Sequence, residues 1–246
     1  MRTLVVVPTY IEAQNVVEVL ERAREALPEA DILVVDDNSP DGTAALAEDT
    51  AAKLGQIDVL RRPSKSGLGS AYRAGFSIGL DKGYDVLVQM DADLSHDPAV
   101  LPKLLQAIEG GADVVIGSRY VPGGEIPHWP WFRRALSRYG NRYASIALGT
   151  TVKDATSGFR AYRSDALKAI DYASTRAMGY GFQIETQYRI WQWGGRIVET
   201  PIVFTDRMRG HSKMTWGIFA EELLLVTWWG VRDRLRRLRA RRRAAA

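Results

Sequence analysis

The chain contains no cysteine and only three histidines among its 246 residues. The absence of cysteine excludes disulfides, zinc–thiolate centres and thiol nucleophiles, and it fits a reducing compartment. His96, His128 and His211 lack the spacing of metal ligands, so we expect them to act as hydrogen-bond donors in loops.

Long apolar runs are also missing. No stretch of about 20 apolar residues occurs, so no membrane-spanning helix is predicted. The first ten residues, MRTLVVVPTY, turn polar too soon for a signal peptide. With 46% hydrophobic residues and no internal repeat, the chain can form one large domain over residues 1–214, followed by an extension over residues 215–246.

The charge is unevenly distributed along the chain. Residues 232–246 hold eight arginines and one aspartate, a net charge of +7. The remaining 25 basic and 28 acidic side chains give residues 1–231 a net charge of −3. This asymmetry predicts that the domain and the C-terminal segment meet different partners.

Short apolar runs alternate with helical patterns over the first 120 residues. Strands are predicted at residues 3–8, 31–36, 56–60, 85–90 and 112–117, and helices near 13–27, 41–54, 68–82 and 98–109. Because the strands are apolar almost throughout, the order predicts an α/β fold with a doubly wound, mainly parallel sheet. Ligands of such folds bind beyond the carboxyl ends of the strands.

The second half of the chain has fewer clear elements. Residues 118–135, rich in proline, glycine and aromatics, predict a long loop of the kind that is often functional. Helices are expected near residues 132–148 and 181–193, a strand at 196–204, and a long final helix from Trp216 onward.

Three aspartates crowd the stretch MDADLSHDP at the end of a predicted strand. Asp91 and Asp93 can turn toward one cation, and hard oxygen ligands of this kind suit Mg²⁺ or Mn²⁺. Asp97 precedes a proline and is expected to cap a helix. Ser95 could reach the ion directly, through a water, or not at all.

Two other motifs are weaker. Asp37, Ser39 and Asp41 match the first positions of an EF-hand calcium loop, but a strand pattern enters the loop where an EF-hand needs a helix. Tyr72 stands where a dinucleotide-binding fingerprint needs its third glycine, and the first βα turn, PTYIEAQN, holds no glycine. The sequence therefore argues against an EF-hand and a Rossmann dehydrogenase.

Seven blocks of the sequence together resemble a known family. They are VVVPTYIEAQN, ILVVDDNSPDGT, KSGLGSAYRAGF, VLVQMDADLSHDP, VVIGSRYVPGG, TSGFRAYR and RMRGHSK, in order from residue 3 to about 214. The chain thus resembles the polyprenol-phosphate (dolichol-phosphate) mannosyltransferases, inverting family 2 glycosyltransferases with a GT-A fold. One departure is Ile11, where that family usually has asparagine (PTYNE).

The resemblance implies roles for individual residues. Asp91, Asp93 and Arg119 would be catalytic, and Asp91, Asp93 and Ser95 would hold Mg²⁺ or Mn²⁺. Arg119, Arg133 and Arg207 would contact the acceptor phosphate. The nucleotide sugar would be bound by Pro8, Tyr10, Glu12, Val35, Asp37, Asp91, Ala92, Asp93, Arg207 and Lys213.

The implied reaction is inverting transfer of mannose from GDP-mannose to polyprenyl phosphate. The lipid phosphate is already largely ionised near neutral pH, so the reaction does not require a protein base. Two rival hypotheses remain: a polyprenyl-phosphate glucosyl- or hexosyltransferase that uses another nucleotide sugar, and a catalytically degenerate nucleotide-sugar-binding membrane protein.

The C-terminal segment predicts an amphipathic helix. Leu224, Trp228, Val231, Leu235 and Leu238 recur at helical spacing, with arginines on the other faces. This pattern predicts a helix that lies on a membrane surface, so that the protein is peripheral, at the cytoplasmic face, with a membrane protein as a possible further partner. The alternatives are a nucleic-acid-binding tail, which lacks interleaved aromatics and is not expected, and an apolar face packed on the domain.

Overall fold

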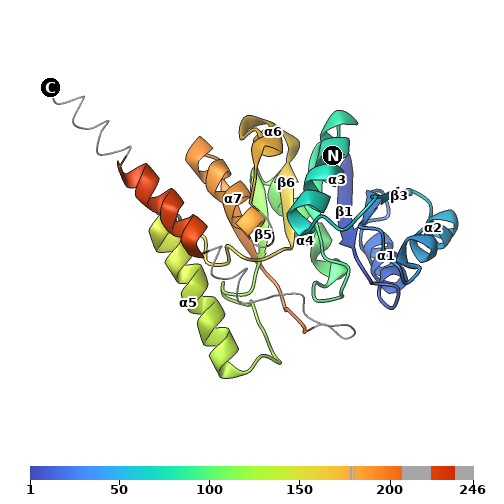
Figure 1. Ribbon diagram of the computed structural model, residues 1–246, viewed down its shortest axis with the longest axis horizontal. Coiled ribbons are helices and arrows are strands. Elements are labelled where there is room, and N and C mark those ends of the chain that lie inside the picture. The colour runs from blue at the N-terminus through green and yellow to red at the C-terminus, as the bar shows by residue number, and fades with distance from the viewer. Residues whose placement is uncertain (178, 180, 207–222, 236–246) are drawn as a thin grey trace.

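The computed structural model describes residues 1–177, 179, 181–206 and 223–235. These residues form a seven-stranded sheet with the order β3-β2-β1-β4-β6-β5-β7 (Figure 1). The strands are β1 (Thr3–Thr9), β2 (Asp31–Asp36), β3 (Ile57–Arg61), β4 (Val86–Gln89), β5 (Val114–Ser118), β6 (Arg160–Arg163) and β7 (Ile197–Pro201). All neighbours pair in parallel except β6, which is antiparallel to β4 and β5. The predicted α/β fold with a mainly parallel sheet is confirmed.

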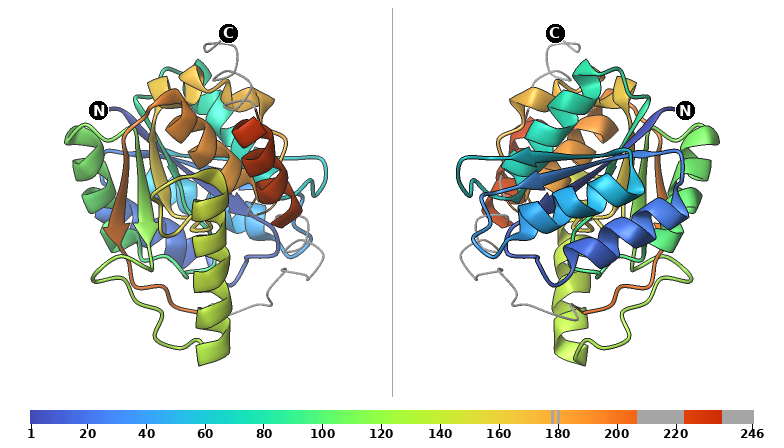
Figure 2. Two further views of the ribbon diagram at one scale, coloured as in Figure 1. Left: turned by 90° about the vertical axis from the view of Figure 1, so that its left-hand side faces the viewer. Right: turned by 90° about the vertical axis from the view of Figure 1, so that its right-hand side faces the viewer.

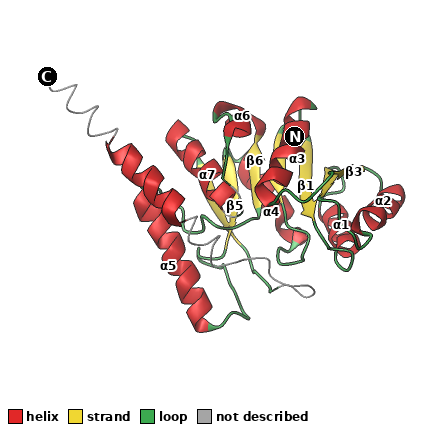
Figure 3. Cartoon of the chain, viewed as in Figure 1, coloured by secondary structure: helices red, strands yellow, loops and turns green. Residues whose placement is uncertain are grey.

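Helices cover both faces of this sheet (Figure 2). They are α1 (Val16–Ala26), α2 (Thr43–Leu54), α3 (Leu68–Asp81), α4 (Leu101–Glu109), α5 (Trp131–Leu148), α6 (Ser164–Ala169) and α7 (Gly181–Trp193), with 3₁₀ turns η1 (Pro98–Val100) and η2 (Tyr172–Ser174). Figure 3 shows the alternation of strands and helices along the chain.

Alternate residues of the strands enter two separate cores. Val5 and Val7 of β1 pack with α1, α2 and α4, whereas Leu4 and Val6 pack with α3, α6 and α7. This division follows from the two-residue period of a strand, whose successive side chains point to opposite faces. The doubly wound arrangement is thereby confirmed.

The predicted boundaries differ from the structure in a few places. Strand β6 and helix α6 were not predicted. The last strand ends at Pro201 rather than at residue 204, and the helix expected at residues 98–109 begins as the turn η1 before α4. Asp97 caps this turn as expected, because its Oδ1 accepts a hydrogen bond from the Ala99 N–H at 3.1 Å.

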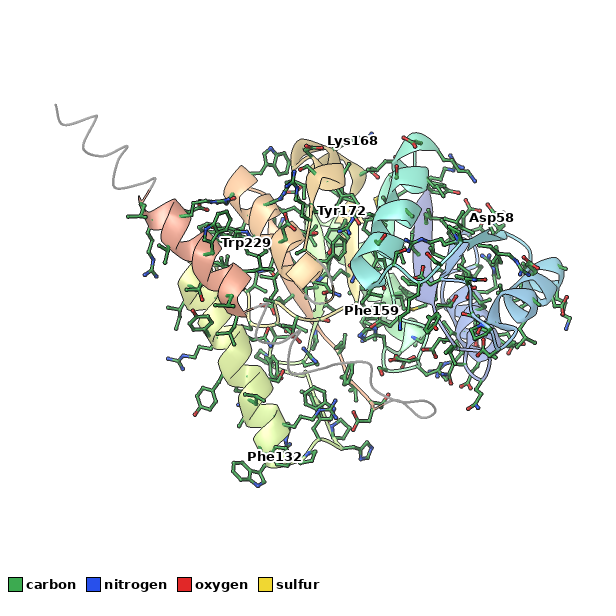
Figure 4. All side chains as sticks on the ribbon, in the orientation of Figure 1. Asp58, Phe132, Phe159, Lys168, Tyr172 and Trp229 are labelled. Carbon is green, nitrogen blue, oxygen red and sulfur yellow. The ribbon has the colours of Figure 1, made fainter. Side chains whose placement is uncertain are left out.

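Residues 223–235 form a helix that lies beside α5, at the end of the sheet away from α2 (Figure 1). The two helices approach so closely that a Cβ on Gly230 would lie 2.4 Å from the Ala147 carbonyl oxygen. Trp229 is buried next to Tyr188 of α7, with 6.5 Å between the ring centroids (Figure 4). The predicted C-terminal helix is confirmed over these residues; residues 216–222 and 236–246 lie outside the described part.

Ile11, the residue that departs from the family motif, has an unusual backbone conformation. Its φ of +58° lies in the left-handed region, which β-branched residues rarely adopt. Asparagine tolerates this region because its short polar side chain can hydrogen-bond to the local backbone. The Ile11 N–H donates to Ser39 Oγ at 3.0 Å, so the strained residue connects the loops that follow β1 and β2.

We expect Ile11→Asn to be more stable than Ile11→Thr by about 1 kcal/mol, because only threonine keeps a branched Cβ in the left-handed region. Both substitutions act on a side chain that is 49% exposed, so lost burial contributes little to the difference between them. Urea denaturation measures the difference in free energy of unfolding. Equal stabilities would contradict this explanation.

Candidate active site

The predicted site residues gather where the parallel strands β1, β2 and β4 end. Pro8 and Tyr10 lie at the end of β1, Asp37 directly follows β2, and Asp91 and Asp93 follow β4. Hydrogen bonds join the first two of these ends: the Asp37 N–H donates to the Thr9 carbonyl at 3.0 Å, and Thr9 Oγ1 donates to Asp36 Oδ1 at 2.8 Å. The fold therefore brings these predicted site residues to the same carboxyl edge of the sheet.

Glu12 and Tyr10 are held by different contacts. Glu12 is 9% exposed; its N–H donates to Thr43 Oγ1 at 3.0 Å, and its Oε2 accepts from Asn15 Nδ2 at 2.8 Å. Tyr10 is partly exposed, and Lys65 Nζ lies 4.2 Å from the centroid of its ring. Tyr10 thus presents an aromatic surface next to a cation, which suits an anionic ligand with a planar base.

Asp37 is tied to the segment after β3. Its Oδ1 accepts from Arg62 Nη1 at 2.8 Å, and its Oδ2 accepts from the Ser66 N–H at 3.0 Å. Arg62 also donates to Ser70 Oγ of α3 at 2.7 Å. Arg62 was not among the predicted site residues; it reaches Asp37 because β3 pairs with β2.

Two residues that were predicted to bind the nucleotide sugar have side chains buried in the core. Val35 is fully buried in the core between β2 and α3, and a Cβ on Gly75 would lie 3.3 Å from its Cγ2. Ala92 is 3% exposed and belongs to the core on the opposite face of the sheet. If either residue contacts a nucleotide, the contact is made by its backbone.

Asp91 is the more open of the two candidate metal ligands. Its side chain is 28% exposed, and its Oδ1 accepts a hydrogen bond from the Tyr72 hydroxyl at 3.0 Å. Burial is the main cause that raises the pKa of Tyr72 well above its usual value, with the neighbouring Asp91 adding to the shift, so the hydroxyl stays a donor.

Asp93 is buried, and it belongs to the same loop as His96. It is 4% exposed, and its Oδ1 accepts from the Ser95 N–H at 3.0 Å. The His96 ring is 3% exposed and stacks on Phe159, with 5.1 Å between the centroids. Burial lowers the pKa of His96 to about 4, and the charge of Arg119 acts in the same direction, while Asp93 opposes it. The imidazole is therefore neutral near pH 7.

The carboxylates fit a hard divalent ion by their chemistry, because both are oxygen ligands at one strand end. Among the residues that the structure describes, no group of three or more acidic, histidine or cysteine side chains could hold a metal ion. An ion at Asp91 and Asp93 would thus need further oxygens from water, from a hydroxyl such as that of Ser95, or from a bound diphosphate.

Arg119 is held by a buried ion pair that the sequence did not reveal. Its Nε and Nη2 donate to the two oxygens of Asp154 at 2.8 and 2.7 Å, and its backbone N–H donates to Asp154 Oδ2 at 2.9 Å. Burial raises the pKa of Asp154, but the Arg119 charge and these hydrogen bonds outweigh it, so the pKa lies below its ordinary value.

Arg133, in the first turn of α5, is more exposed than Arg119. Its guanidinium carbon lies 3.9 Å from the centroid of a Trp129 ring, and its Nη1 donates to Asp206 Oδ1 at 3.1 Å. Trp129 Nε1 donates to the same oxygen at 2.7 Å. Both Arg133 and Asp206 remain about 40% exposed, at 40% and 41%. The predicted residues Arg207 and Lys213 lie outside the described part of the chain.

Aromatic rings connect the aspartate loop with the loop that carries Arg119. The centroids of His96 and Phe204 lie 5.7 Å apart, and those of Phe204 and Trp129 also lie 5.7 Å apart. The Arg119 guanidinium lies 5.3 Å from the Phe204 ring. A continuous set of ring contacts therefore links the loop of the predicted metal ligands to the predicted phosphate ligands Arg119 and Arg133.

Comparison with known proteins identifies the family. The model of the family "Glycosyl transferase family 2" matches residues 4–171. The chain is 51% identical to the undecaprenyl-phosphate mannosyltransferase of Micrococcus luteus, covering 98% of this chain and 99% of that protein. It is 49% identical to the polyprenol monophosphomannose synthase of Mycolicibacterium smegmatis, covering 97% of this chain and 90% of the relative.

Solved structures agree on the fold. A glucosyl-3-phosphoglycerate synthase from Mycobacterium tuberculosis, crystallised with Mn²⁺, UDP-glucose and phosphoglyceric acid, superposes with a TM-score of 0.67 at 19% identity, covering 92% of this chain and 77% of the other. The α/β architecture with a mixed, mainly parallel sheet is thus GT-A-like. The chain belongs to glycosyl transferase family 2, among the polyprenol-phosphate mannosyltransferases.

Proposed function

We propose that the protein transfers mannose from GDP-mannose to a polyprenyl monophosphate, with a divalent metal ion at Asp91 and Asp93. The observation that carries the proposal is the pair of carboxylates after β4, in a chain about half identical, over nearly its whole length, to relatives named for this reaction. Pro8, Tyr10, Glu12 and Asp37 would bind the nucleotide.

The reaction needs orientation and charge rather than a protein base. An oxygen of the lipid phosphate forms a bond to the anomeric carbon of mannose while the bond from that carbon to GDP breaks, and GDP leaves with the electron pair. Attack opposite the leaving group inverts the anomeric carbon and gives a β-mannosyl phospholipid. A divalent ion, when bound, supplies charge that offsets the negative charge developing on the leaving diphosphate.

Two arginines are proposed to bind or lie near the phosphate of the lipid acceptor. Arg133 is half-exposed next to Trp129, and a planar guanidinium can bind two phosphate oxygens at once. Arg119, which is paired with the buried Asp154, is proposed to lie near the same phosphate. Arg207 and Lys213 are proposed to complete the phosphate-binding set, as the family resemblance implies.

A membrane surface is the proposed place of the reaction. Within the described residues, no helix combines the length and the apolar character that crossing a bilayer requires. The proposed membrane contact is instead a surface made by two adjacent helices, here named the two-helix surface. Its exposed apolar residues are Trp131, Phe132, Leu136, Tyr139, Tyr143 and Ile146 of α5, and Leu224, Trp228, Val231 and Leu235 of the C-terminal helix.

The exposure of this surface argues against the alternative in which the apolar face of the C-terminal helix packs on the domain. Trp228 is 57% exposed and Leu224 is 72% exposed, whereas Val226 and Trp229 on another face are buried. Phe132 lies at the end of α5 that points away from the sheet (Figure 4). Because α5 also holds four arginines and no acidic residue, an anionic lipid surface is its complementary partner.

A donor and acceptor screen tests the reaction. With Mn²⁺ and a polyprenyl phosphate, radiolabel from GDP-mannose is expected in the lipid fraction, because the proposed reaction needs only these two substrates and a divalent ion. Transfer from UDP-glucose but not from GDP-mannose would instead support the rival hexosyltransferase. Binding of nucleotide sugar without transfer from any donor would support the degenerate binding protein.

Asp91→Asn and Asp93→Asn are each expected to lower metal-dependent turnover by on the order of 100-fold, because a neutral amide is a poorer ligand for a divalent ion. Asp97→Asn is the matched control from the same stretch, since Asp97 caps η1 and pairs with Arg22. It should keep nearly full activity. Initial rates over a Mn²⁺ titration measure the effect, and full activity of both Asp91 and Asp93 variants would refute the metal role.

Removing apolar side chains from the two-helix surface should weaken membrane binding. We expect Leu224→Ser with Trp228→Ser, and separately Phe132→Ser with Ile146→Ser, each to lower the fraction of protein that sediments with anionic vesicles by several-fold. Leu46→Ser on α2, at the other end of the sheet, is the control and should not change it. Binding unaffected by both double substitutions would exclude this surface as the membrane contact.

A further inference from the structure

We propose that Tyr72 is a positioning residue that orients the Asp91 carboxylate for the divalent ion. The inference rests on the proposed function, because it assigns the metal to Asp91 and Asp93. Tyr72 lies on α3, in a part of the sequence with no predicted site residue. Its hydroxyl donates to Asp91 Oδ1 at 3.0 Å from a side chain that is completely buried.

The ring of Tyr72 is fixed by its neighbours. It stacks on Phe182 of α7 at an interplanar angle of 5°, with 6.1 Å between the centroids, and it packs against Phe76 at 6.0 Å. In a densely packed core, contacts on both sides of a large ring restrict its movement. The hydroxyl therefore reaches Asp91 from a fixed point, and the hydrogen bond fixes the carboxylate in turn.

The second oxygen of Asp91 is confined from another direction. His96 Nδ1 lies 3.9 Å from Asp91 Oδ2, and a Cβ on Gly158 would lie 3.0 Å from that oxygen. A side chain at residue 158 would thus push the carboxylate aside. The Asp91 side chain nonetheless stays 28% exposed, so it is held on the protein side and accessible from the other.

This restraint matters because the residues that the structure describes offer the ion few ligands. Asp93 receives a hydrogen bond from the Ser95 N–H of its own loop, whereas the Tyr72 hydroxyl that donates to Asp91 comes from α3, 19 residues earlier in the chain. Partners that orient a metal ligand without touching the metal typically contribute about 10–100-fold to metal affinity. We expect removal of the Tyr72 hydroxyl to weaken metal binding by a factor in this range.

The test is Tyr72→Phe, which removes one oxygen and leaves the ring. Mn²⁺ affinity is measured by electron paramagnetic resonance with GDP present, and we expect the dissociation constant to rise by about 10–100-fold. Tyr162→Phe is the matched control, since Tyr162 is equally buried and its hydroxyl lies 3.4 Å from Gln89 Oε1. It should bind Mn²⁺ as the unsubstituted protein does.

A second measurement separates positioning from a structural role. High Mn²⁺ should restore the turnover of Tyr72→Phe, because its metal ligands are intact, but not that of Asp91→Asn. Unchanged Mn²⁺ affinity in Tyr72→Phe, or an equal loss of Mn²⁺ affinity in Tyr162→Phe, would overturn this inference but leave the proposed metal site standing. An unsubstituted protein that binds no Mn²⁺ with GDP present would overturn the proposed metal site and this inference with it.

Discussion

The close approach of α3 to the sheet determines how the site is built. A Cβ on Gly75 would lie 2.5 Å from Val6 Cγ1, and one on Gly79 would lie 2.4 Å from Leu87 Cδ2, so only glycine lets the helix lie directly on β1 and β4. Tyr72 shares this face, at the i, i+3 and i+7 spacing of a helix. The same contact that packs the core therefore brings the Tyr72 hydroxyl to Asp91.

Three acids near the carboxyl edge of the sheet are each held by a partner from another segment of the chain. Asp37 pairs with Arg62 after β3, Asp91 accepts from Tyr72 of α3, and Asp154 pairs with Arg119 after β5. Such pairing offsets the repulsion between carboxylates near one strand edge, and the cost of burying them. Carboxylates paired in this way would repel a bound diphosphate less than unpaired ones would.

Periodicity predicted most of the fold, because apolar runs of four to six residues report a sheet covered on both faces. It missed β6, where Arg160 is fully buried and breaks the apolar pattern; its guanidinium donates to the carbonyls of Ser157, Gln183 and Ala155. The motifs predicted Asp91 and Asp93, but their partners depend on tertiary contacts that no local pattern encodes. Helical spacing likewise identified the apolar face of the C-terminal helix, yet only the structure reveals that a different face packs on the domain.

Arg119 and Arg133, the two candidate phosphate ligands that the structure describes, differ in the ion pair that a phosphate would have to break. Arg119 and Asp154 form a buried pair, and leaving one such charge unpaired typically costs about 3–5 kcal/mol. Arg133 and Asp206 form a half-exposed pair, whose contribution is typically about 0–1 kcal/mol. A phosphate could therefore replace Asp206 at Arg133 at little cost, while Arg119 would keep Asp154. Of these two described arginines, the one that can exchange its partner is therefore Arg133 at the start of α5, next to the exposed Trp131 and Phe132.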